Sequence, residues 1–386
     1  MRILSLNGGS SSLKLGLYEL GATETRLAAG AVEGIGTERG QCWMRDAAGR
    51  SLTNAPGDFA DSRVAVHAVF AVMETLRLPP PDAVGHRVVQ GGPDRAPPEC
   101  VDARLVAALR RLVPLAPLHL PAEIDAIEAV AARFPSLPQA VCFDTAFHRR
   151  MPELAQRFPL PPALWDRGIR RYGFHGLSYE YVVRTVGAAE LRRAVIAHLG
   201  NGASMVAVRE GQPLDTTMGF TPSGGFMMGT RSGDLDPGVL LHLLAHEGWD
   251  AAALECLVNR EAGLLGVSGI TSDMRTLLEQ RAGDPRAALA VEMFCHQLRK
   301  HVGALAAVLD GLDTLVFTGG IGERAAPVRR EVCEGLGHLG VRLDRVRNDA
   351  HAAVISASDS ACTVRVVPTD EGLMIARHTR AVLGGG

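Results

Sequence analysis

A chain of 386 residues is too long for one hydrophobic core, so its length predicts two domains. Hydrophobic residues make up 47% of it and charged residues 21%, the balance of a water-soluble globular protein. The net charge of −2 gives no electrostatic basis for binding nucleic acid or an anionic membrane, and no apolar run approaches membrane-spanning length.

The seven cysteines contain no Cys-x-x-Cys pair, which predicts reduced thiols rather than a disulfide framework or a zinc site. Met1 leads directly into a strand pattern, without the basic and apolar segments of a signal peptide. Both features indicate a cytoplasmic protein.

The hydrophobic pattern predicts strands that alternate with helices, and therefore α/β layers. Strands are expected at 2–7, 12–20, 83–89, 139–143, 194–199, 204–209, 313–317 and 363–367. Helices are expected at 101–111, 121–134, 178–187, 236–246, 272–280, 286–309, 323–335 and 371–383. Ser178 is expected to begin one helix, with Glu180 in its first turn, and Asp284-Pro285 to begin another.

The domain boundary is expected near residues 147–170, where a proline-rich loop precedes a new glycine-rich motif. We predict one domain of residues 1–147 and 368–386, closed by the C-terminal helix, and a second domain of residues 148–367.

Residues 5–14 read Ser-Leu-Asn-Gly-Gly-Ser-Ser-Ser-Leu-Lys and lie between two predicted strands. Backbone N–H groups of such a turn, with its hydroxyls and the Lys14 ammonium, can bind a polyanion. The turn lacks the Walker spacing, and no helix follows as in a dinucleotide fingerprint. Only Lys14 and Lys300 are lysines, so we expect a specific role for Lys14. The alternative is an ordinary Gly/Ser hairpin turn.

The same pattern of strand, Gly/Asn/Ser turn and strand recurs at residues 194–208, and a third glycine-rich turn follows a strand at 318–323. Two related hairpins nearly half the chain apart predict a duplicated domain pair that binds a nucleotide. Closure of the two domains over that nucleotide is a further expectation.

Three motifs in the first half place a polar side chain beside an apolar segment. Arg87 lies at a strand end before two glycines, where its guanidinium could bind a carboxylate or phosphate, or lie at the surface. Asp144 follows an apolar strand, where ligand sites of α/β proteins lie, but it could instead cap a helix. His119 lies among apolar residues and prolines, as a core histidine does.

Three motifs in the second half are polar turns. His175 lies between Gly173-Phe174 and Gly176, which predicts an exposed, backbone-constrained imidazole. Arg231 lies in a turn with two acids, which a surface turn would also explain. Glu371 begins the last helix, where it could bind a cation beside a helix cap. His242 and His246 fit a helix face better than a metal site, and the strand pattern around Cys142 predicts burial.

Together these segments resemble the acetate kinases and, more broadly, the short-chain acyl kinases. The matches run in family order along the chain: Asn-Gly-Gly-Ser-Ser-Ser-Leu-Lys at 7–14, Gly-His-Arg-Val-Val at 85–89, Phe-Asp-Thr-Ala-Phe-His at 143–148, Arg-Tyr-Gly-Phe-His-Gly at 171–176, His-Leu-Gly-Asn-Gly-Ala-Ser at 198–204, Met-Gly-Thr-Arg-Ser-Gly-Asp at 228–234 and Phe-Thr-Gly-Gly-Ile-Gly-Glu at 317–323.

The resemblance implies two duplicated ribonuclease H-like α/β domains around an interdomain cleft, the fold of the acetate and sugar kinases, Hsp70 and actin. It implies Mg²⁺-dependent transfer of the ATP γ-phosphoryl group to acetate, giving acetyl phosphate and ADP, with Mn²⁺ as a substitute ion. It also implies a homodimer. The first domain would bind the acyl group and phosphate, and the second domain the nucleotide.

The resemblance also implies roles for residues at matching positions. Catalytic or transition-state-stabilising residues would be Arg87, Asp144, His175 and Arg231, with His119 nearby. The metal would be positioned by Asn7 and Glu371. The acyl group would contact Arg87, Val89, Leu118, Phe174 and Pro222. The nucleotide would contact Lys14, His198, Leu199, Gly200, Asn201, Gly202, Asp273, Met274, Arg275, Gly320, Ile321 and Gly322.

Physical reasoning agrees with this chemistry. A metaphosphate-like transition state needs positioning and cationic groups more than covalent help from the protein. A carboxylate nucleophile is already ionised at neutral pH, so the absence of an obvious base–nucleophile pair is expected.

The chain departs from the family pattern at three places. Leu120 and Glu123 replace two asparagines, Ser-Gly-Gly at 223–225 replaces Leu-Glu-Gly, and Arg324 replaces an asparagine. The first two concern acyl-chain preference and the third concerns the phosphoryl donor. A propionate kinase is therefore the nearest alternative, and an actin- or Hsp70-like nucleotide switch is a distant one.

Overall fold

The computed structural model describes residues 1–9 and 11–384. Ser10 of the first loop, and residues 385–386 at the end of the first predicted domain, lie outside the described residues. The chain divides into two compact units: unit 1 is Met1–Phe147 with Asp370–Gly386, and unit 2 is His148–Thr369. The return to unit 1 thus falls at Asp370.

Unit 1 is built on a mixed sheet with the strand order β5-β4-β3-β2-β1-β6-β8-β7 among the described residues. Its strands are β1 (Arg2–Gly8), β2 (Ser12–Leu20), β3 (Glu24–Glu33), β4 (Gly40–Asp46), β5 (Ser51–Gly57), β6 (Ala83–Val88), β7 (Glu99–Cys100) and β8 (Gln139–Phe143). Its helices are α1 (Ser62–Thr75), α2 (Ala103–Leu112), α3 (Leu120–Arg133) and α15 (Glu371–Leu383).

Unit 2 contains a smaller mixed sheet with the order β11-β10-β9-β12-β13. Its strands are β9 (Ala194–Leu199), β10 (Ala203–Arg209), β11 (Gln212–Thr216), β12 (Thr314–Thr318) and β13 (Thr363–Val366). Its helices are α4 (Glu153–Gln156), α5 (Pro162–Asp166), α6 (Gly176–Val186), α7 (Pro237–His246), α8 (Ala251–Cys256), α9 (Gly263–Ser268), α10 (Met274–Gln280), α11 (Pro285–Leu309), α12 (Gly319–Arg324), α13 (Ala326–Glu334) and α14 (Arg345–Asp349). Single 3₁₀ turns lie at Val113–Leu115, Phe147–Arg150, Ala188–Glu190 and Gly337–Leu339, and a π-helical turn at Leu257–Glu261.

Five strands of the unit 1 sheet have the same order and directions as the five strands of the unit 2 sheet, which confirms the predicted duplication. In unit 1, β3, β2 and β1 are antiparallel neighbours, and β6 and β8 continue the sheet in parallel. In unit 2, β11, β10 and β9 are antiparallel, and β12 and β13 continue in parallel. In both units a tight hairpin therefore leads into a parallel half-sheet.

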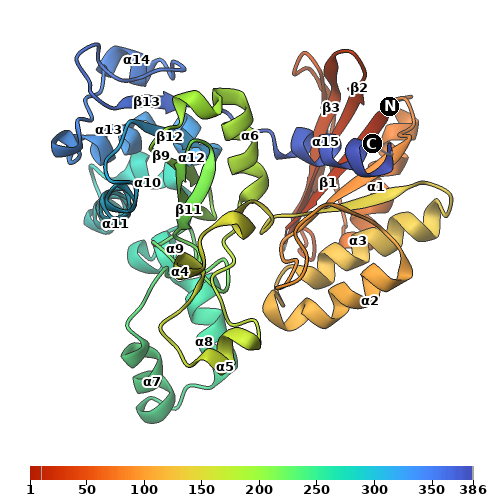
Figure 1. The fold of residues 1–386 in the computed structure, drawn as a ribbon. Coiled ribbons are helices and arrows are strands. Elements are labelled where there is room, and N and C mark those ends of the chain that lie inside the picture. The colour runs from red at the N-terminus through yellow and green to blue at the C-terminus, as the bar shows by residue number, and fades with distance from the viewer. Residues whose placement is uncertain (10, 385–386) are drawn as a thin grey trace. The chain divides into compact units, whose positions relative to one another are not determined.

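Alternation along β1 divides the core of unit 1 between the two faces of its sheet. Leu4 and Leu6 pack with apolar residues of α1 and α3 on one face, whereas Ile3 packs with Tyr18 and with Ala376 of α15 on the other. Figure 1 shows α15 lying beside β1 and β2. Helix α15 thus covers the face of the sheet opposite α1 and α3.

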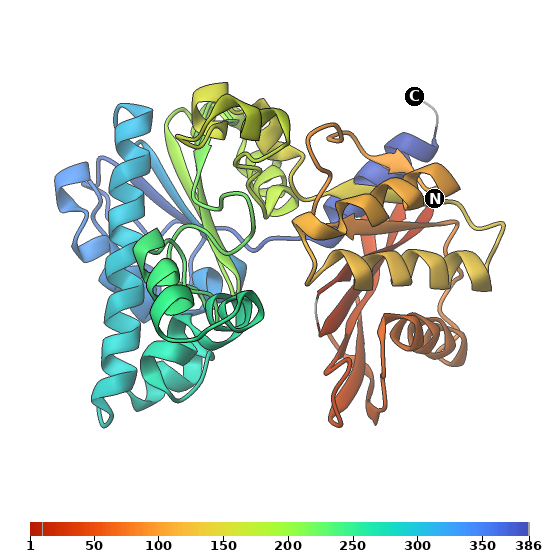
Figure 2. The same cartoon turned by 90° about the horizontal axis from the view of Figure 1, so that it is seen from below.

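In unit 2 the long helix α11 packs along β9, β10 and β11, and is the cyan helix of Figure 2. Its buried residues, among them Val291, Phe294, Leu298 and Val302, recur every three or four positions and form one apolar stripe. Asp284 caps this helix by accepting from the Arg286 N–H at 2.8 Å, as the sequence predicted.

Two predicted helix boundaries were wrong. The helix expected from Ser178 begins at Gly176, because His175 occupies its N-cap with a left-handed backbone and Ser178 already lies inside the first turn. The helix expected at 323–335 is two helices, α12 and α13. The break falls at Ala325, two residues before Pro327, whose missing N–H and ring disfavour a continuous helix.

Candidate active site

The carboxyl ends of β1, β6 and β8 in unit 1 bring polar side chains to one edge of the sheet, where ligands of α/β proteins bind. Asn7 lies near the end of β1, Arg87 near the end of β6, and Asp144 directly after β8. Glu371 is the first residue of α15, which packs against all three strands. The sheet thereby gathers four residues that are far apart in sequence.

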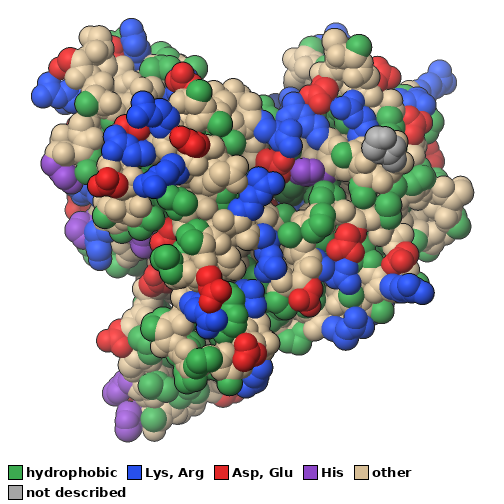
Figure 3. Space-filling view, viewed as in Figure 1, with side chains coloured by type: hydrophobic (Ala, Val, Ile, Leu, Met, Phe, Trp, Pro, Cys, Tyr) green, Lys and Arg blue, Asp and Glu red, His purple; other side chains and the backbone are tan. Residues whose placement is uncertain are grey.

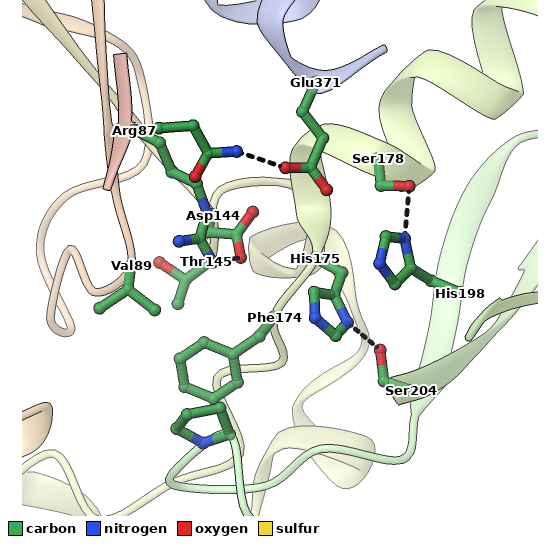
Figure 4. Close-up of polar contacts among 12 residues, drawn as sticks. Arg87, Val89, Asp144, Thr145, Phe174, His175, Ser178, His198, Ser204 and Glu371 are labelled. Carbon is green, nitrogen blue, oxygen red and sulfur yellow. Dashed lines mark hydrogen bonds and ion pairs between the residues drawn. The ribbon is translucent and has the colours of Figure 1, made fainter. Parts of the chain in front are cut away.

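Arg87 is the centre of a buried ionic cluster. Its Nη2 donates to Asp144 Oδ2 at 2.7 Å, its Nη1 lies 3.8 Å from Glu123 Oε1, and only 13% of its side chain is exposed. Glu123 Oε2 also accepts from the Val89 backbone N–H at 3.0 Å. We call Arg87, Glu123, Asp144 and the Val89 backbone the Arg87 cluster (Figure 4 shows all but Glu123). The surface-arginine and helix-cap alternatives for Arg87 and Asp144 are therefore wrong.

The cluster shifts the pKa of two of its members. Burial alone would lower the pKa of Arg87, but the charges of Asp144, Glu123 and Glu371 raise it, so the guanidinium stays protonated. Burial raises the pKa of Glu123 to about 7, against the opposing effects of Arg87 and the Val89 N–H. Glu123 therefore changes charge in the physiological range.

Asn7 and Glu371 offer oxygen atoms to a metal ion. Asn7 Nδ2 donates to Glu371 Oε2 at 2.7 Å, so an amide and a carboxylate meet where α15 begins. The described residues contain no group of three or more His, Cys, Asp or Glu side chains that could hold a metal on its own. One carboxylate and one amide fit Mg²⁺, which is commonly held by one or two carboxylates together with substrate phosphates.

In unit 2 the turn between β9 and β10 lies beside two histidines. His175 Nδ1 lies 2.8 Å from Ser204 Oγ of β10, and His198 Nδ1 of β9 lies 2.8 Å from Ser178 Oγ of α6 (Figure 4). The two imidazoles stack with ring centroids 4.2 Å apart. Nδ1 of each ring is therefore held by a serine hydroxyl, which fixes the orientation of both imidazoles.

Close backbone packing brings Arg231 to the same turn. A Cβ on Gly202 would lie 3.2 Å from Arg231 Nη1 and 3.5 Å from His175 Nε2. A Cβ on Gly229 would lie 1.9 Å from Asn201 Oδ1, and the Gly229 N–H donates to the Asn201 carbonyl at 2.9 Å. Asn201 and Arg231 are therefore held beside His175 by two glycines that could not carry side chains without displacing them.

The third glycine-rich segment forms the start of a helix rather than a turn. β12 passes directly into α12, which contains Gly320, Ile321 and Gly322. Glu323 of α12 accepts from the backbone N–H groups of Gly319 and Thr369, each at 3.1 Å, and so ties the end of β12 to the segment after β13. Thr369 in turn accepts from Ser178 at 2.9 Å, which links this segment to the histidine pair.

The remaining residues predicted from the sequence lie in both units. Asp273 caps α10 by accepting from the Arg275 N–H at 3.2 Å, next to buried Met274. Lys14 is exposed on β2 opposite Asn7. Leu199 is buried and ends β9, followed by Gly200 in the turn. His119 is half-buried at the N-cap position of α3, not in the core.

The four residues expected to contact the acyl group fall in different units. Val89 and Leu118 belong to unit 1, and Phe174 and Pro222 belong to unit 2. Val89 and Phe174 are 1% exposed, whereas Leu118 and Pro222 are half-buried.

Sequence reasoning missed the residues that hold the candidates in place. Glu123 was noted only as a departure from the family pattern, Ser178 only as a helix start, and Ser204 only as part of a turn. Glu323 ends the family motif at 317–323, but the sequence assigned it no role. Glu123 and Ser178 could have been found from the sequence, because each is a polar residue on an otherwise buried helix face and such a residue needs a hydrogen-bond partner.

Comparison with known proteins identifies the family. The model of the acetokinase family matches residues 2–377. The chain belongs to the acetokinase family. A curated acetate kinase of Rhodopseudomonas palustris (strain ATCC BAA-98 / CGA009) is 47% identical over 403 residues, covering 100% of this chain and 99% of that protein.

Solved structures of the acetokinase family share the fold. The acetate kinase of Porphyromonas gingivalis has a TM-score of 0.87 at 39% identity, with 99% of each chain covered. A propionate kinase from Francisella tularensis subsp. tularensis SCHU S4 has a TM-score of 0.91 at 36% identity, with 98% of each chain covered. The predicted fold class is confirmed.

Proposed function

We propose that this chain is an acetate kinase, which transfers the γ-phosphoryl group of ATP reversibly to acetate and forms acetyl phosphate and ADP. The observation that carries the proposal is the similarity over the whole chain to proteins named acetate kinase. The chemistry of the two side-chain clusters supports it independently.

In the proposed reaction an acetate oxygen attacks the γ-phosphorus, a new P–O bond forms, and the bond to the β–γ bridging oxygen breaks as ADP leaves. Acetate is ionised at neutral pH, so no side chain has to remove a proton. What the protein must supply is positive charge and donors, because two anions approach each other and charge spreads over the transferring group.

The Arg87 cluster suits the carboxylate substrate. Asp144 holds Arg87 through a single nitrogen at 2.7 Å, which leaves the planar guanidinium with further N–H donors. We assign Arg87 to the acetate carboxylate and Asp144 to the orientation of Arg87. Val89, fixed through its backbone N–H, would contact the methyl group.

His175 and Arg231 suit the transferring phosphoryl group. Their Nε2 and Nη1 atoms lie near the Cβ position of Gly202, in a turn that carries no bulky side chain. The neighbouring turn N–H groups and Asn201 would bind the nucleotide phosphates, and Asp273, Arg275, Gly320 and Ile321 the adenosine. Mg²⁺ held by Glu371 and Asn7 would neutralise phosphate charge when bound.

An acyl-hydroxamate assay with ATP and the series acetate, propionate and butyrate tests the reaction and the chain length together. Acetate kinase activity predicts the highest kcat/KM for acetate. Highest kcat/KM for propionate would instead support the second candidate, a propionate kinase, which the likeness to the Francisella protein favours. No hydroxamate with any of the three acids would refute both.

We also propose a homodimer. Helix α7 has no buried residue, and Val239, Leu241 and Leu244 are among its large exposed side chains. Figure 3 shows hydrophobic and histidine side chains gathered in this region. A Leu241→Glu variant that changes a dimeric mass to a monomeric one in light scattering would support an interface at α7, and a monomeric parent protein would refute the dimer.

We further propose that the enzyme acts in the cytoplasm, because all seven cysteines are free thiols, as in reducing compartments. None of the described helices is long and apolar enough to cross a membrane.

A further inference from the structure

Glu123 is a buried carboxyl group that the reaction does not require. It lies on α3 with 3% exposure, and its Oε2 accepts from the Val89 N–H at 3.0 Å. Its Oε1 has no hydrogen-bond partner among the described residues and lies 3.8 Å from Arg87 Nη1. One side chain therefore touches both the guanidinium assigned to acetate and the backbone of the residue assigned to the methyl group.

The charges around Arg87 do not balance when Glu123 is ionised. Asp144 alone would neutralise Arg87 through its 2.7 Å ion pair, and Glu123 adds a second negative charge to the same guanidinium. Glu371 also acts on Arg87, so a carboxylate substrate brings a fourth negative charge. Like charges that share one cation in a low-dielectric site repel each other strongly, so an ionised Glu123 opposes the binding of an anion at Arg87.

We propose that Glu123 is a specificity-determining residue that sets the affinity of the Arg87 cluster for the carboxylate substrate, weakening binding when it is ionised and allowing tighter binding when it is protonated. The inference rests on the proposed function, because it assigns the carboxylate of acetate to Arg87. Glu123 acts through Arg87 and Val89 and is a positioning residue, not a catalytic one.

Two charged groups and one histidine lie around Glu123. Arg87 of β6 and Asp144 after β8 are the charged groups that act on its pKa. His119 precedes it by one helical turn on α3. On the helices packed against α3, Arg63 of α1 pairs with Asp125 and Glu128, and Arg110 of α2 pairs with Glu128.

The test is the KM for acetate measured from about pH 6 to about pH 8.5 in the parent protein, in Glu123→Gln and in Glu128→Gln, which is the matched control on the same helix. The amide of Glu123→Gln keeps an acceptor for the Val89 N–H but removes the charge. In the parent we expect KM to rise roughly three- to tenfold across this range as Glu123 ionises. In Glu123→Gln we expect a low KM that no longer changes with pH, whereas Glu128→Gln follows the parent.

Two outcomes overturn the inference: a parent KM that stays flat across the range, or a Glu123→Gln variant that retains the parent's pH dependence. If Glu123→Gln does not fold, Glu123→Asp serves instead. It keeps the charge, so it should keep the rise of KM with pH, and a flat profile would contradict the proposal. A parent protein that forms no acyl phosphate from acetate would refute the proposed function itself, which separates the two failures.

Discussion

Replacement of Arg87 by alanine should lower both the free energy of unfolding and kcat, for two separate reasons. The substitution removes the only cation in the Arg87 cluster and leaves the carboxylates of Asp144 and Glu123 buried, at 0% and 3% exposure. Removing one partner of a buried ion pair costs about 3–5 kcal/mol. The carboxylate assigned to Arg87 is the attacking nucleophile, so loss of the guanidinium also removes a donor from the transition state and should lower kcat by roughly 10²–10³.

A second substitution separates these two effects. Adding Glu123→Gln to Arg87→Ala removes one of the two stranded carboxylates, while its amide still accepts from Val89. We expect the double variant to recover about 1–2 kcal/mol of the lost free energy of unfolding. Turnover should not recover, because the guanidinium is still missing.

Urea unfolding measures the stability difference, and the acyl-hydroxamate assay measures kcat on the folded fraction. The reasoning fails if kcat of Arg87→Ala stays within a few-fold of the parent, or if the double variant is no more stable than Arg87→Ala. Glu128→Gln in place of Glu123→Gln is the control for the second substitution and should restore nothing.

Four further changes test other parts of the molecule. His175→Ala should lower kcat by roughly 10²–10³ with little change in melting temperature, and unchanged turnover would contradict its assigned role. Gly229→Ala should raise KM for ATP about tenfold or more, because its Cβ would lie 1.9 Å from Asn201 Oδ1; an unchanged KM would show that Asn201 is dispensable. Between about pH 4.5 and pH 7 the free energy of unfolding of the parent should fall by about 3 kcal/mol relative to that of Glu123→Gln, because the folded protein binds a proton at Glu123 more tightly than the unfolded chain; a constant difference in urea titrations would contradict this. Cys142→Ser should leave kcat within about threefold, since Cys142 is 1% exposed in the sheet; a large loss in the hydroxamate assay would require a role for the thiol.

Much of the fold could be predicted because its central strands are unambiguous. The strand predicted at 139–143 matches β8, and the strand at 194–199 matches β9, since short apolar runs bounded by turn residues have few other structures. The outer strands β3 to β5 were missed. β5 has an exposed, polar pattern with Pro56 near its end, so hydrophobic periodicity gives no signal there.

The main residues of the candidate site could be predicted from the sequence, but the hydrogen bonds that hold them in place could not. Arg87, Asp144 and His175 occur in glycine-flanked or strand-end motifs that are visible in the sequence. The bonds of Glu123 to Val89 and of Ser178 to His198 join elements 34 and 20 residues apart, and local patterns cannot show such pairings. The start of α6 was misplaced for a related reason, because a histidine at φ 60° is held by its surroundings rather than by its own preference.

Unit 1 is built from two segments that are far apart in the sequence, which constrains the order in which the chain can fold. Ile3 and Tyr18 are synthesised before residues 148–369, whereas α15, the helix that shields them, is synthesised after those residues. Until α15 leaves the ribosome, one face of the unit 1 sheet lacks the helix that covers it. Unit 2 can therefore reach its native structure before unit 1 does, and removal of α15 should expose the apolar residues Ile3 and Tyr18 to proteases and chaperones.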